Sequence, residues 1–248
     1  MKKNELHKTN PNVSVDSVIL GFDFNQLNVL LINRDSHQNE EDKILALPGN
    51  LIYDNEDLDM AANRVLRELT GIKDIYLDQI GAFGNPDRIS KKSDRKWLES
   101  IRAHPDARVI TIAYYTLVKM EDFVPQPSSF AKSAIWVPLN KVEELAFDHS
   151  EILESAVARL RKKIIIHPIG FNLLPNKFTL SQLQKLYESI LGRVLDKRNF
   201  RRKVLKLAIL TQLKEKETGV THKPASYYKF NKVKYEALVK TGFDNFAF

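Results

Sequence analysis

Hydrophobic and polar residues in the first two thirds of the chain alternate in runs that predict β-strands. The runs VSVDSVILGFD and NVLLINR are apolar and separated by a short polar turn, which predicts a β-hairpin. IYLDQIGAFGN and ARVITIAYYTLV predict two further strands. We expect the charged stretch between them, PDRISKKSDRKWLESIRAHPD, to form a surface loop with at most a helical turn.

A helical period replaces this alternation between Leu58 and Leu69. Apolar residues recur there at spacings of three and four, which is the pattern of an amphipathic helix with one buried stripe. The stripe consists of Leu58, Ala61, Ala62, Val65, Leu66 and Leu69. Glu56 and Asp57 place negative charge at the start of this helix, and Gly71 is a natural stop. SAIWVPLNKVEELAF then predicts a strand leading to a short helix, and HSEILESAVARLRKKII predicts a longer helix, so we expect a mixed α/β domain.

The pattern changes near Ile165, where IIIHPIGFNLLPNK has two prolines and no helical period. We therefore divide the chain into domains at residues 1–165 and 166–248. The second domain begins with a helix that Thr179 can cap and Gly192 can end. A second helix follows a possible cap at Asp196, with an apolar stripe of Phe200, Val204 and Leu207. A hairpin with a polar, basic tip comes next, and this order of elements predicts a winged helix-turn-helix.

Positive charge is concentrated in the second domain. The chain has a net charge of +7, but residues 166–248 hold 16 Lys and Arg against 6 Asp and Glu, whereas residues 1–165 hold 22 against 25. Such asymmetry favours a polyanion as the partner of the second domain. The alternative is a basic domain whose charge serves only solubility.

Five cations lie within seven residues at the beginning of the second predicted helix of that domain. This is where a recognition helix contacts base edges in the major groove, and an asparagine there can read adenine. The candidate DNA-binding residues of this helix are Lys197, Arg198, Asn199, Arg201, Arg202 and Lys203. His222 and Lys223, at the hairpin tip, would contact the DNA backbone as a wing. The alternative is a solvated charged face. RNA is less favoured, because no aromatic stacking platform is evident.

Composition limits the cellular setting. The chain has no cysteine, which excludes disulfides and cysteine-built zinc sites and fits a reducing compartment. Its N-terminus, MKKNELHKTNPNV, lacks the apolar stretch of a signal peptide, and no run approaches about 18 apolar residues. We expect a cytoplasmic protein without a membrane partner. His149 and His167 are isolated in the sequence and are interpreted as ordinary core or surface histidines.

The segment Gly49–Ile72 resembles the Nudix box, whose family pattern is G-x5-E-x7-R-E-U-x-E-E-x-G-U with U aliphatic. Six defined positions agree, namely Glu56, Arg64, Leu66, Glu68, Gly71 and Ile72. Asn50 stands where the first glycine belongs, and Val65 and Leu69 stand where two glutamates belong. Arg64 and Glu68 are also spaced to form an ion pair on the helix. The resemblance implies the Nudix α/β/α sandwich for the first domain.

In active Nudix enzymes three glutamates, at positions equivalent to 65, 68 and 69, share one helix face and hold Mg²⁺ against a pyrophosphate. Only Glu68 is present here. We therefore expect no catalytic activity, no metal site and no cofactor. The alternative from another functional class is a hydrolase of a nucleoside diphosphate derivative with rearranged ligands, drawn from Glu56, Glu68 and Asp87.

A pocket without these carboxylates would suit a neutral polyol held by hydrogen bonds, or a phosphate bound directly by arginines. The candidate effector-binding residues are Arg34, Asn50, Glu68, Phe83, Asn85, Asp87 and Arg88. Part of this set, FGNPDR, is equally compatible with a plain β-turn, because Asn-Pro-Asp favours one.

A degenerate Nudix domain followed by FTLSQLQKLYESILGRVLDKRNFRRKVL resembles the Nudix-related transcriptional regulators. That family implies a homodimer in which the Nudix domain senses a small-molecule effector and the winged helix binds a palindromic double-stranded operator. Its branches respond to ADP-ribose and control NAD metabolism, or respond to sugars such as L-arabinose and control their catabolism, so an ADP-ribose-sensing regulator of NAD metabolism is the alternative within the family. The missing carboxylates favour the arabinose-responsive branch, and hence a repressor of sugar catabolism. A third interpretation is a protein-binding adaptor with a basic tail.

Overall fold

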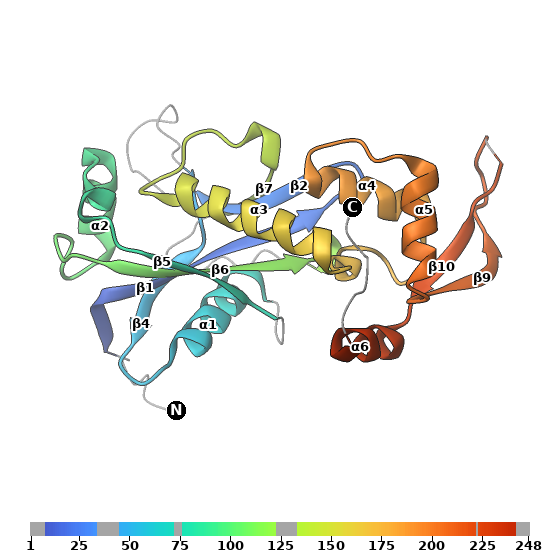
Figure 1. The fold of residues 1–248 in the computed structure, drawn as a ribbon. Helices are drawn as coiled ribbons and strands as arrows, with labels where there is room; N and C mark the ends of the chain where they lie inside the picture. Colours follow the sequence, from blue (N-terminus) through green and yellow to red (C-terminus); the bar gives the residue numbers. More distant parts are fainter. Residues whose placement is uncertain (1–7, 34–44, 72–75, 123–132, 222, 242–248) are drawn as a thin grey trace, which may run out of the picture. The chain divides into compact units, whose positions relative to one another are not determined.

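A computed structural model provides the fold (Figure 1). It describes residues 8–33, 45–71, 76–122, 133–221 and 223–241. The described residues divide into two compact units. The first unit comprises the chain up to Leu20 together with Asn28–Thr116 and Glu121–Ala156, and the second comprises Gly21–Leu27, Leu117–Met120 and the chain from Val157 onward. No helix in these ranges is long and apolar enough to cross a membrane.

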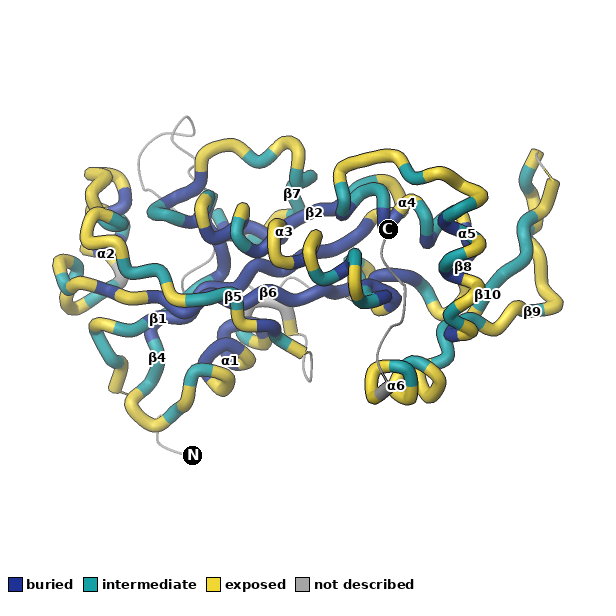
Figure 2. The backbone as a smooth tube through the Cα atoms, in the orientation of Figure 1, coloured by how far each residue is buried: buried dark blue, intermediate teal, exposed yellow. Residues whose placement is uncertain are grey.

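A seven-stranded sheet forms the centre of the first unit. Its main path runs in the order β3-β2-β1-β6-β5, while β4 pairs with β1 and β7 pairs with β2. Its strands are β1 (Thr9–Phe22), β2 (Leu27–Asn33), β3 (Leu45–Ala46), β4 (Gly49–Tyr53), β5 (Asp78–Phe83), β6 (Ile110–Val118) and β7 (Ser133–Pro138). Figure 2 shows that β1, β2 and β6 are buried along most of their length. The predicted strands, and the mixed α/β class, are confirmed.

Helix α1 (Leu58–Thr70) forms where the helical period predicted it. The Asp57 side chain caps its beginning by accepting from the backbone N–H of Met60, and Gly71 ends it in a left-handed conformation at φ 70°. Its buried residues pack on side chains of β1, β2 and β6 in one core cluster, which includes Val15, Ile32, Ala61, Ala62, Val65, Ile112 and Tyr114. Val65 is therefore a core residue.

The charged stretch between β5 and β6 is more ordered than the expected surface loop. It forms a 3-10 helix, η2 (Pro86–Ile89), and a ten-residue helix, α2 (Lys92–Ile101). Helix α2 forms because Asp94 and Leu98, one turn apart, are both fully buried, so tertiary packing offsets its polar composition. The expectation of a loop with at most a helical turn was wrong here.

Helix α3 (His149–Ile166) follows β7 and a short 3-10 helix, η4 (Leu139–Lys141), which takes the place of the predicted short helix. The division between the two units falls within α3, at residues 156 and 157. The sequence-based boundary between residues 165 and 166 stays a prediction.

The second unit has the helix–turn–helix–hairpin order predicted from the sequence (Figure 1). Thr179 and Gln182 form a reciprocal capping box at the start of α4 (Leu180–Leu191), and Gly192 ends this helix at φ 68°. Asp196 caps α5 (Lys197–Lys206), which buries Phe200 and Val204.

A small sheet follows these helices, in the order β8-β10-β9. Its strands are β8 (Phe178–Thr179), β9 (Leu210–Lys216) and β10 (Ser226–Phe230), so the predicted hairpin gains a third strand. Helix α6 (Lys232–Thr241), which the sequence pattern did not indicate, packs through Tyr235 on Phe230, with ring centres 5.3 Å apart. The winged helix-turn-helix is confirmed.

Candidate effector pocket and DNA-binding surface

Arg64 on α1 organises the Nudix-like segment of the first unit. Its Nε and Nη2 donate to the two Glu56 carboxylate oxygens at 2.9 and 2.6 Å, and Nη2 also donates to the Leu51 carbonyl oxygen at 3.0 Å. Its Nη1 donates to Glu68 at 3.3 Å, which confirms the predicted Arg64–Glu68 pair. Burial lowers the pKa of Arg64, but Glu56 and Glu68 outweigh burial and raise it above its ordinary value.

These residues do not fit the Mg²⁺ that a Nudix enzyme would use. Val65 is completely buried and has no oxygen donor, and Leu69 lies on α1 with an aliphatic side chain. Both Glu56 oxygens are occupied by Arg64, and one of them also accepts from the backbone N–H of Tyr53 at 2.7 Å. Within the described ranges, no group of three or more acidic or histidine side chains is arranged to hold a metal ion. Hard divalent cations need several such oxygen donors.

A buried cluster of charged side chains lies beside a cavity elsewhere in the first unit. Arg88 donates from Nε and Nη2 to the two Asp148 carboxylate oxygens at 2.9 and 2.7 Å, and its Nη2 lies 3.5 Å from an Asp16 oxygen. The Arg88 side chain is only 6% exposed. Burial lowers the pKa of Arg88, but Asp16 and Asp148 raise it by more. A Cβ on Gly49 would meet Asp16 Oδ1 at 1.8 Å, so only glycine leaves room for this carboxylate.

His149 belongs to the same cluster. Its Nδ1 accepts a hydrogen bond from the backbone N–H of Leu47 at 2.9 Å, so the proton of a neutral ring lies on Nε2. Nε2 is 3.7 Å from Asp16. The sequence suggested an isolated histidine, whereas the structure places it in the wall of the cavity.

Helix α2 supplies another wall of the cavity, with Trp97, Leu98 and the adjoining Arg102. Asp94, on the same helix, accepts from the backbone N–H of Phe147 at 2.9 Å. Phe147 also lines the cavity, and its ring centre lies 5.9 Å from that of Trp97.

The cavity includes only part of the residue set expected to bind an effector. Arg88 lines it, whereas Asn50, Glu68, Phe83, Asn85 and Asp87 are not among its lining residues, and Arg34 falls outside the described residues. Asn50 accepts from the Leu51 N–H at 2.8 Å, and Asn85 caps η2 by accepting from the Asp87 N–H at 3.0 Å. FGNPDR is thus a turn that leads Arg88 into the cluster.

Sequence reasoning missed five residues of this site, for two different reasons. Asp16 carries a visible signal, because it is a charged residue inside an apolar strand. Nothing local marks Trp97 and Arg102, which lie in a charged stretch, or Asp148 and His149, which stand where helix α3 begins. Only tertiary contacts bring them together.

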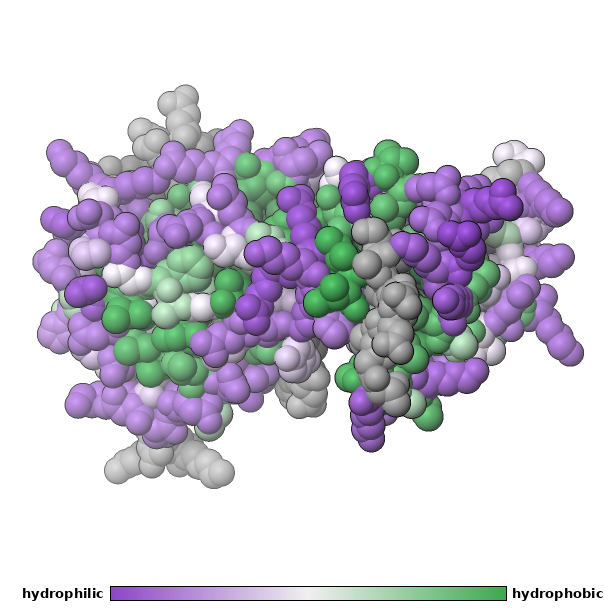
Figure 3. Space-filling model, in the orientation of Figure 1, coloured by the Kyte–Doolittle hydropathy of each residue, from purple (hydrophilic) through white to green (hydrophobic). Residues whose placement is uncertain are grey.

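In the second unit, the α5 cations do not all face solvent. Lys197, Arg198 and Arg202 are exposed, and Lys203 is half-buried. Arg201 Nη2 lies 3.3 Å from Ser181 Oγ on α4, and its Nε is buried without a hydrogen-bond partner in the described structure. Figure 3 shows hydrophilic side chains gathered over α5.

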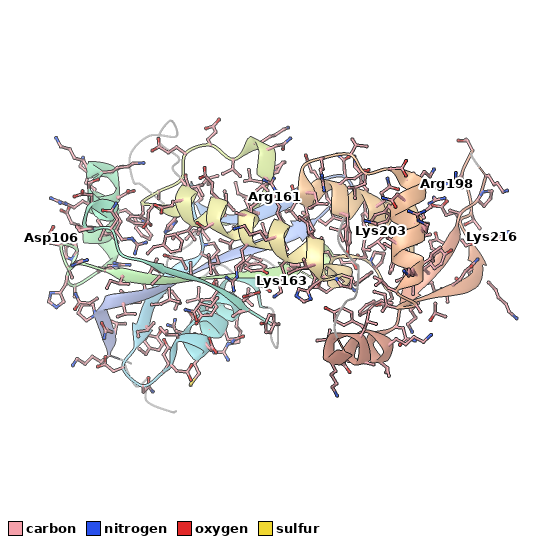
Figure 4. The ribbon with its side chains drawn as sticks, in the orientation of Figure 1. Asp106, Arg161, Lys163, Arg198, Lys203 and Lys216 are labelled. Atoms are coloured by element: carbon pink, nitrogen blue, oxygen red, sulfur yellow. The ribbon has the colours of Figure 1, made fainter. Side chains whose placement is uncertain are left out.

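The candidate base-reading and wing residues are placed as follows. Asn199 Oδ1 accepts from Arg202 Nη2 at 2.9 Å, so this pair forms on the helix surface before any ligand arrives. Lys223 is exposed in the wing, and His222 lies outside the described residues. Figure 4 shows Arg198 near the beginning of α5 and Lys216 near the end of β9. The wing adds further exposed lysines at Lys214, Lys216 and Lys229.

Comparison with known proteins agrees with both units. Residues 170–230 match the family model of the NrtR DNA-binding winged helix domain. The chain is 31% identical over 224 residues to the ADPR responsive transcriptional repressor NtrR of Acinetobacter baylyi, covering 89% of this chain and 82% of that protein. It is 28% identical over 158 residues to an ADP-ribose pyrophosphatase of Methanocaldococcus jannaschii, covering 62% of this chain and 80% of that protein.

A solved relative extends this likeness to three dimensions. The crystal structure of Shewanella oneidensis NrtR complexed with a 27mer DNA matches with a TM-score of 0.70 at 27% identity, covering 90% of this chain and 95% of that one. A Nudix-like domain joined to a winged helix defines a class of transcriptional regulator, and the fold places the chain in it. More particularly, the chain belongs to the NrtR-like family of ligand-responsive repressors.

Proposed function

We propose that this protein is a transcriptional repressor whose Nudix-like domain binds ADP-ribose without hydrolysing it, and that effector binding weakens operator binding. The observation that carries the proposal is the pairing of a metal-incompetent Nudix helix with a winged helix that has an exposed cationic face. The relative in A. baylyi is named for its response to ADPR. The expectation of an arabinose-type effector finds no support in the relatives described above, so arabinose serves as the comparison ligand.

The DNA-binding part of the proposal rests on α5. Its exposed cations Lys197, Arg198 and Arg202 lie in its first two turns. In helix-turn-helix proteins, the N-terminal residues of the recognition helix are the ones that contact base edges in the major groove. Arginine and lysine there contact phosphates and guanine edges. The S. oneidensis relative has been crystallised with a DNA duplex. We propose that a homodimer places two copies of α5 about 34 Å apart on a palindromic operator.

The non-catalytic part of the proposal rests on α1. Hydrolysis of a diphosphate in a Nudix site needs carboxylates that hold divalent ions against the substrate. Val65 is in the core instead, and the carboxylates of Glu56 and Glu68 pair with Arg64. A chain of this kind would keep the binding pocket of the fold and lose its chemistry.

A DNA-binding experiment with the full chain tests the regulatory proposal. Duplexes are first selected from a random library by the protein itself, and the selected duplex is then titrated by fluorescence anisotropy in EDTA. Coupling between two ligands is commonly about 1–3 kcal/mol. ADP-ribose at saturation is therefore expected to weaken DNA binding about 5- to 150-fold, while L-arabinose leaves it unchanged. A response to L-arabinose alone would overturn the choice of effector.

A turnover assay tests the catalytic proposal. ADP-ribose is incubated with the protein and Mg²⁺ or Mn²⁺, and AMP and ribose 5-phosphate are measured by chromatography. We expect no products above the no-protein control. Turnover that is abolished by Glu68→Gln would instead establish a hydrolase with rearranged metal ligands.

A further inference from the structure

The two arginines that line the cavity differ in their hydrogen bonding. Arg88 is held by Asp148 and Asp16, as described above. Arg102, which immediately follows α2, also lines the cavity, yet no carboxylate or hydrogen-bond acceptor of the described structure pairs with its guanidinium. Its backbone N–H alone is bonded, to the Leu98 carbonyl oxygen at 2.8 Å. Among the described residues, the guanidinium of this cavity-lining arginine therefore has no protein acceptor.

This arrangement is electrostatically costly for the empty protein. Burial lowers the pKa of Arg102, and the nearby positive charge of Arg88 lowers it further, while Asp16 partly compensates. Arg102 is half-buried, and a partly desolvated cation without a protein acceptor is less stable than a paired one. Arginine does not avoid this cost by losing its proton. An oxygen-rich anion in the cavity would supply the missing acceptors.

The cavity limits what that anion can be. Its volume is about 40 Å³, which is room for about three water molecules and is enough for one phosphate group. A planar guanidinium forms paired hydrogen bonds to a phosphate, which favours arginine over lysine for this task. Arg88 and Arg102 together balance the charges of Asp16 and Asp148, so an entering phosphate meets a cluster that is neutral in sum.

We propose that Arg102 binds a phosphate group of the effector directly, without a metal ion between them. The inference rests on the proposed function for the presence of a diphosphate in the effector. The inference adds that Arg102 is the residue that recognises the diphosphate, and that this recognition does not need a metal ion. Helix α2 is thereby a part of the effector site and not a surface insertion.

Binding of ADP-ribose to the full chain, measured by isothermal titration calorimetry in EDTA, tests the proposal. Arg102→Gln is expected to weaken binding about 10- to 100-fold, the range for a lost hydrogen bond to a charged group. Arg102→Lys should recover part of the loss, because it keeps the charge without the fork. Arg95→Gln is the matched control, since this α2 arginine is 56% exposed and lies near Asp106 at 3.7 Å. It should bind like the natural chain.

A second readout separates contact from folding. The ³¹P resonances of bound ADP-ribose are expected to shift between the natural chain and Arg102→Lys, which a purely structural role would not cause. Circular dichroism and thermal unfolding of each variant establish that it is folded.

The outcomes distinguish the two levels of the proposal. If the natural chain does not bind ADP-ribose with or without Mg²⁺, the proposed function fails, and this inference fails with it. If it binds and Arg102→Gln binds equally well, the role of Arg102 is overturned while the proposed function stands. Binding that requires Mg²⁺ likewise overturns direct recognition by Arg102.

Discussion

The carboxylate of Asp94 accepts a hydrogen bond from the backbone N–H of Phe147 at 2.9 Å, and Asp94 is completely buried. This bond joins α2 to the segment that enters α3. Phe147 adopts a left-handed conformation at φ 56°, which a side chain other than glycine adopts only at a cost. The Asp94 carboxylate and the contact of the Phe147 ring with Trp97 hold it there. A polar contact from α2 thus fixes the shape of the cavity wall.

Replacing Asp94 by alanine should destabilise the first unit. The Phe147 N–H would lose its acceptor, and an unsatisfied buried donor costs about 1–3 kcal/mol. Urea denaturation is expected to show a decrease of that size in the free energy of unfolding. Asp106→Ala is the control, because the Asp106 side chain is 79% exposed. Equal stabilities for the two variants would show that Asp94 does not hold this segment.

The α5 surface makes a prediction about salt dependence. Arg202→Ala combined with Lys203→Ala removes two cations, so the slope of log K against log salt should become shallower by about 1.8 if both contact phosphates. The affinity for the selected duplex should also fall. Fluorescence anisotropy between low and moderate salt measures both quantities.

A matched double variant on α3 serves as the control for that experiment. Lys162→Ala combined with Lys163→Ala also removes two adjacent cations, one exposed and one half-buried. It lowers the net charge by the same amount and should leave the slope almost unchanged. A change of equal size in both double variants would assign the effect to net charge and not to α5.

Ala208 occupies a position that suits glycine. It follows α5 with φ 54°, is exposed, and its N–H is bonded to the Leu205 carbonyl oxygen at 3.1 Å. The left-handed conformation costs a non-glycine residue about 1–2 kcal/mol, and a glycine would avoid this cost. Part of the benefit is lost, because glycine has more backbone entropy in the unfolded chain. Ala208→Gly should therefore raise the free energy of unfolding by about 0.5–1 kcal/mol. Ala237→Gly, within α6, should lower it by about 1 kcal/mol, so calorimetry should show shifts of opposite sign.

The ionisation of Tyr114 is expected to destabilise the folded protein at alkaline pH. Burial, with the hydrogen bond from its hydroxyl to Asp59 at 2.8 Å, raises the pKa of Tyr114 above its ordinary value. The unfolded chain ionises this tyrosine near pH 10, while the folded chain keeps it neutral. Its contribution is therefore complete below pH 10 and is lost as the pH rises above that value. Melting temperatures from pH 8 to 11 should fall less steeply for Tyr114→Phe, whereas the exposed Tyr76→Phe should follow the natural chain.

Features that depend on neighbouring residues could be predicted from the sequence. The apolar stripe of α1 and its Gly71 stop, the Thr179 cap of α4 and the Asp196 cap of α5 all formed where the sequence placed them. Each depends on spacings of three or four residues, which are visible in a single stretch of sequence. The absence of two glutamates from the Nudix-like helix is likewise a matter of identity at fixed positions.

The cavity and the charged cluster beside it could not be predicted in this way. Arg88 is 60 residues from Asp148 and 72 from Asp16, and no local pattern links them. Helix α2 has a polar composition that favours a loop, and it becomes helical because Asp94 and Leu98 are buried.

The sequence alone therefore determined the main strands, helices α1, α4 and α5, the absence of two Nudix glutamates from α1 and the cationic face of the second unit, because these follow from local periodicity, capping, residue identity and charge. Only the tertiary structure decided that Arg88 pairs with Asp16 and Asp148, while the guanidinium of Arg102 has no acceptor among the described residues. The free energy of a buried charge depends on partners that the fold brings near from distant parts of the chain.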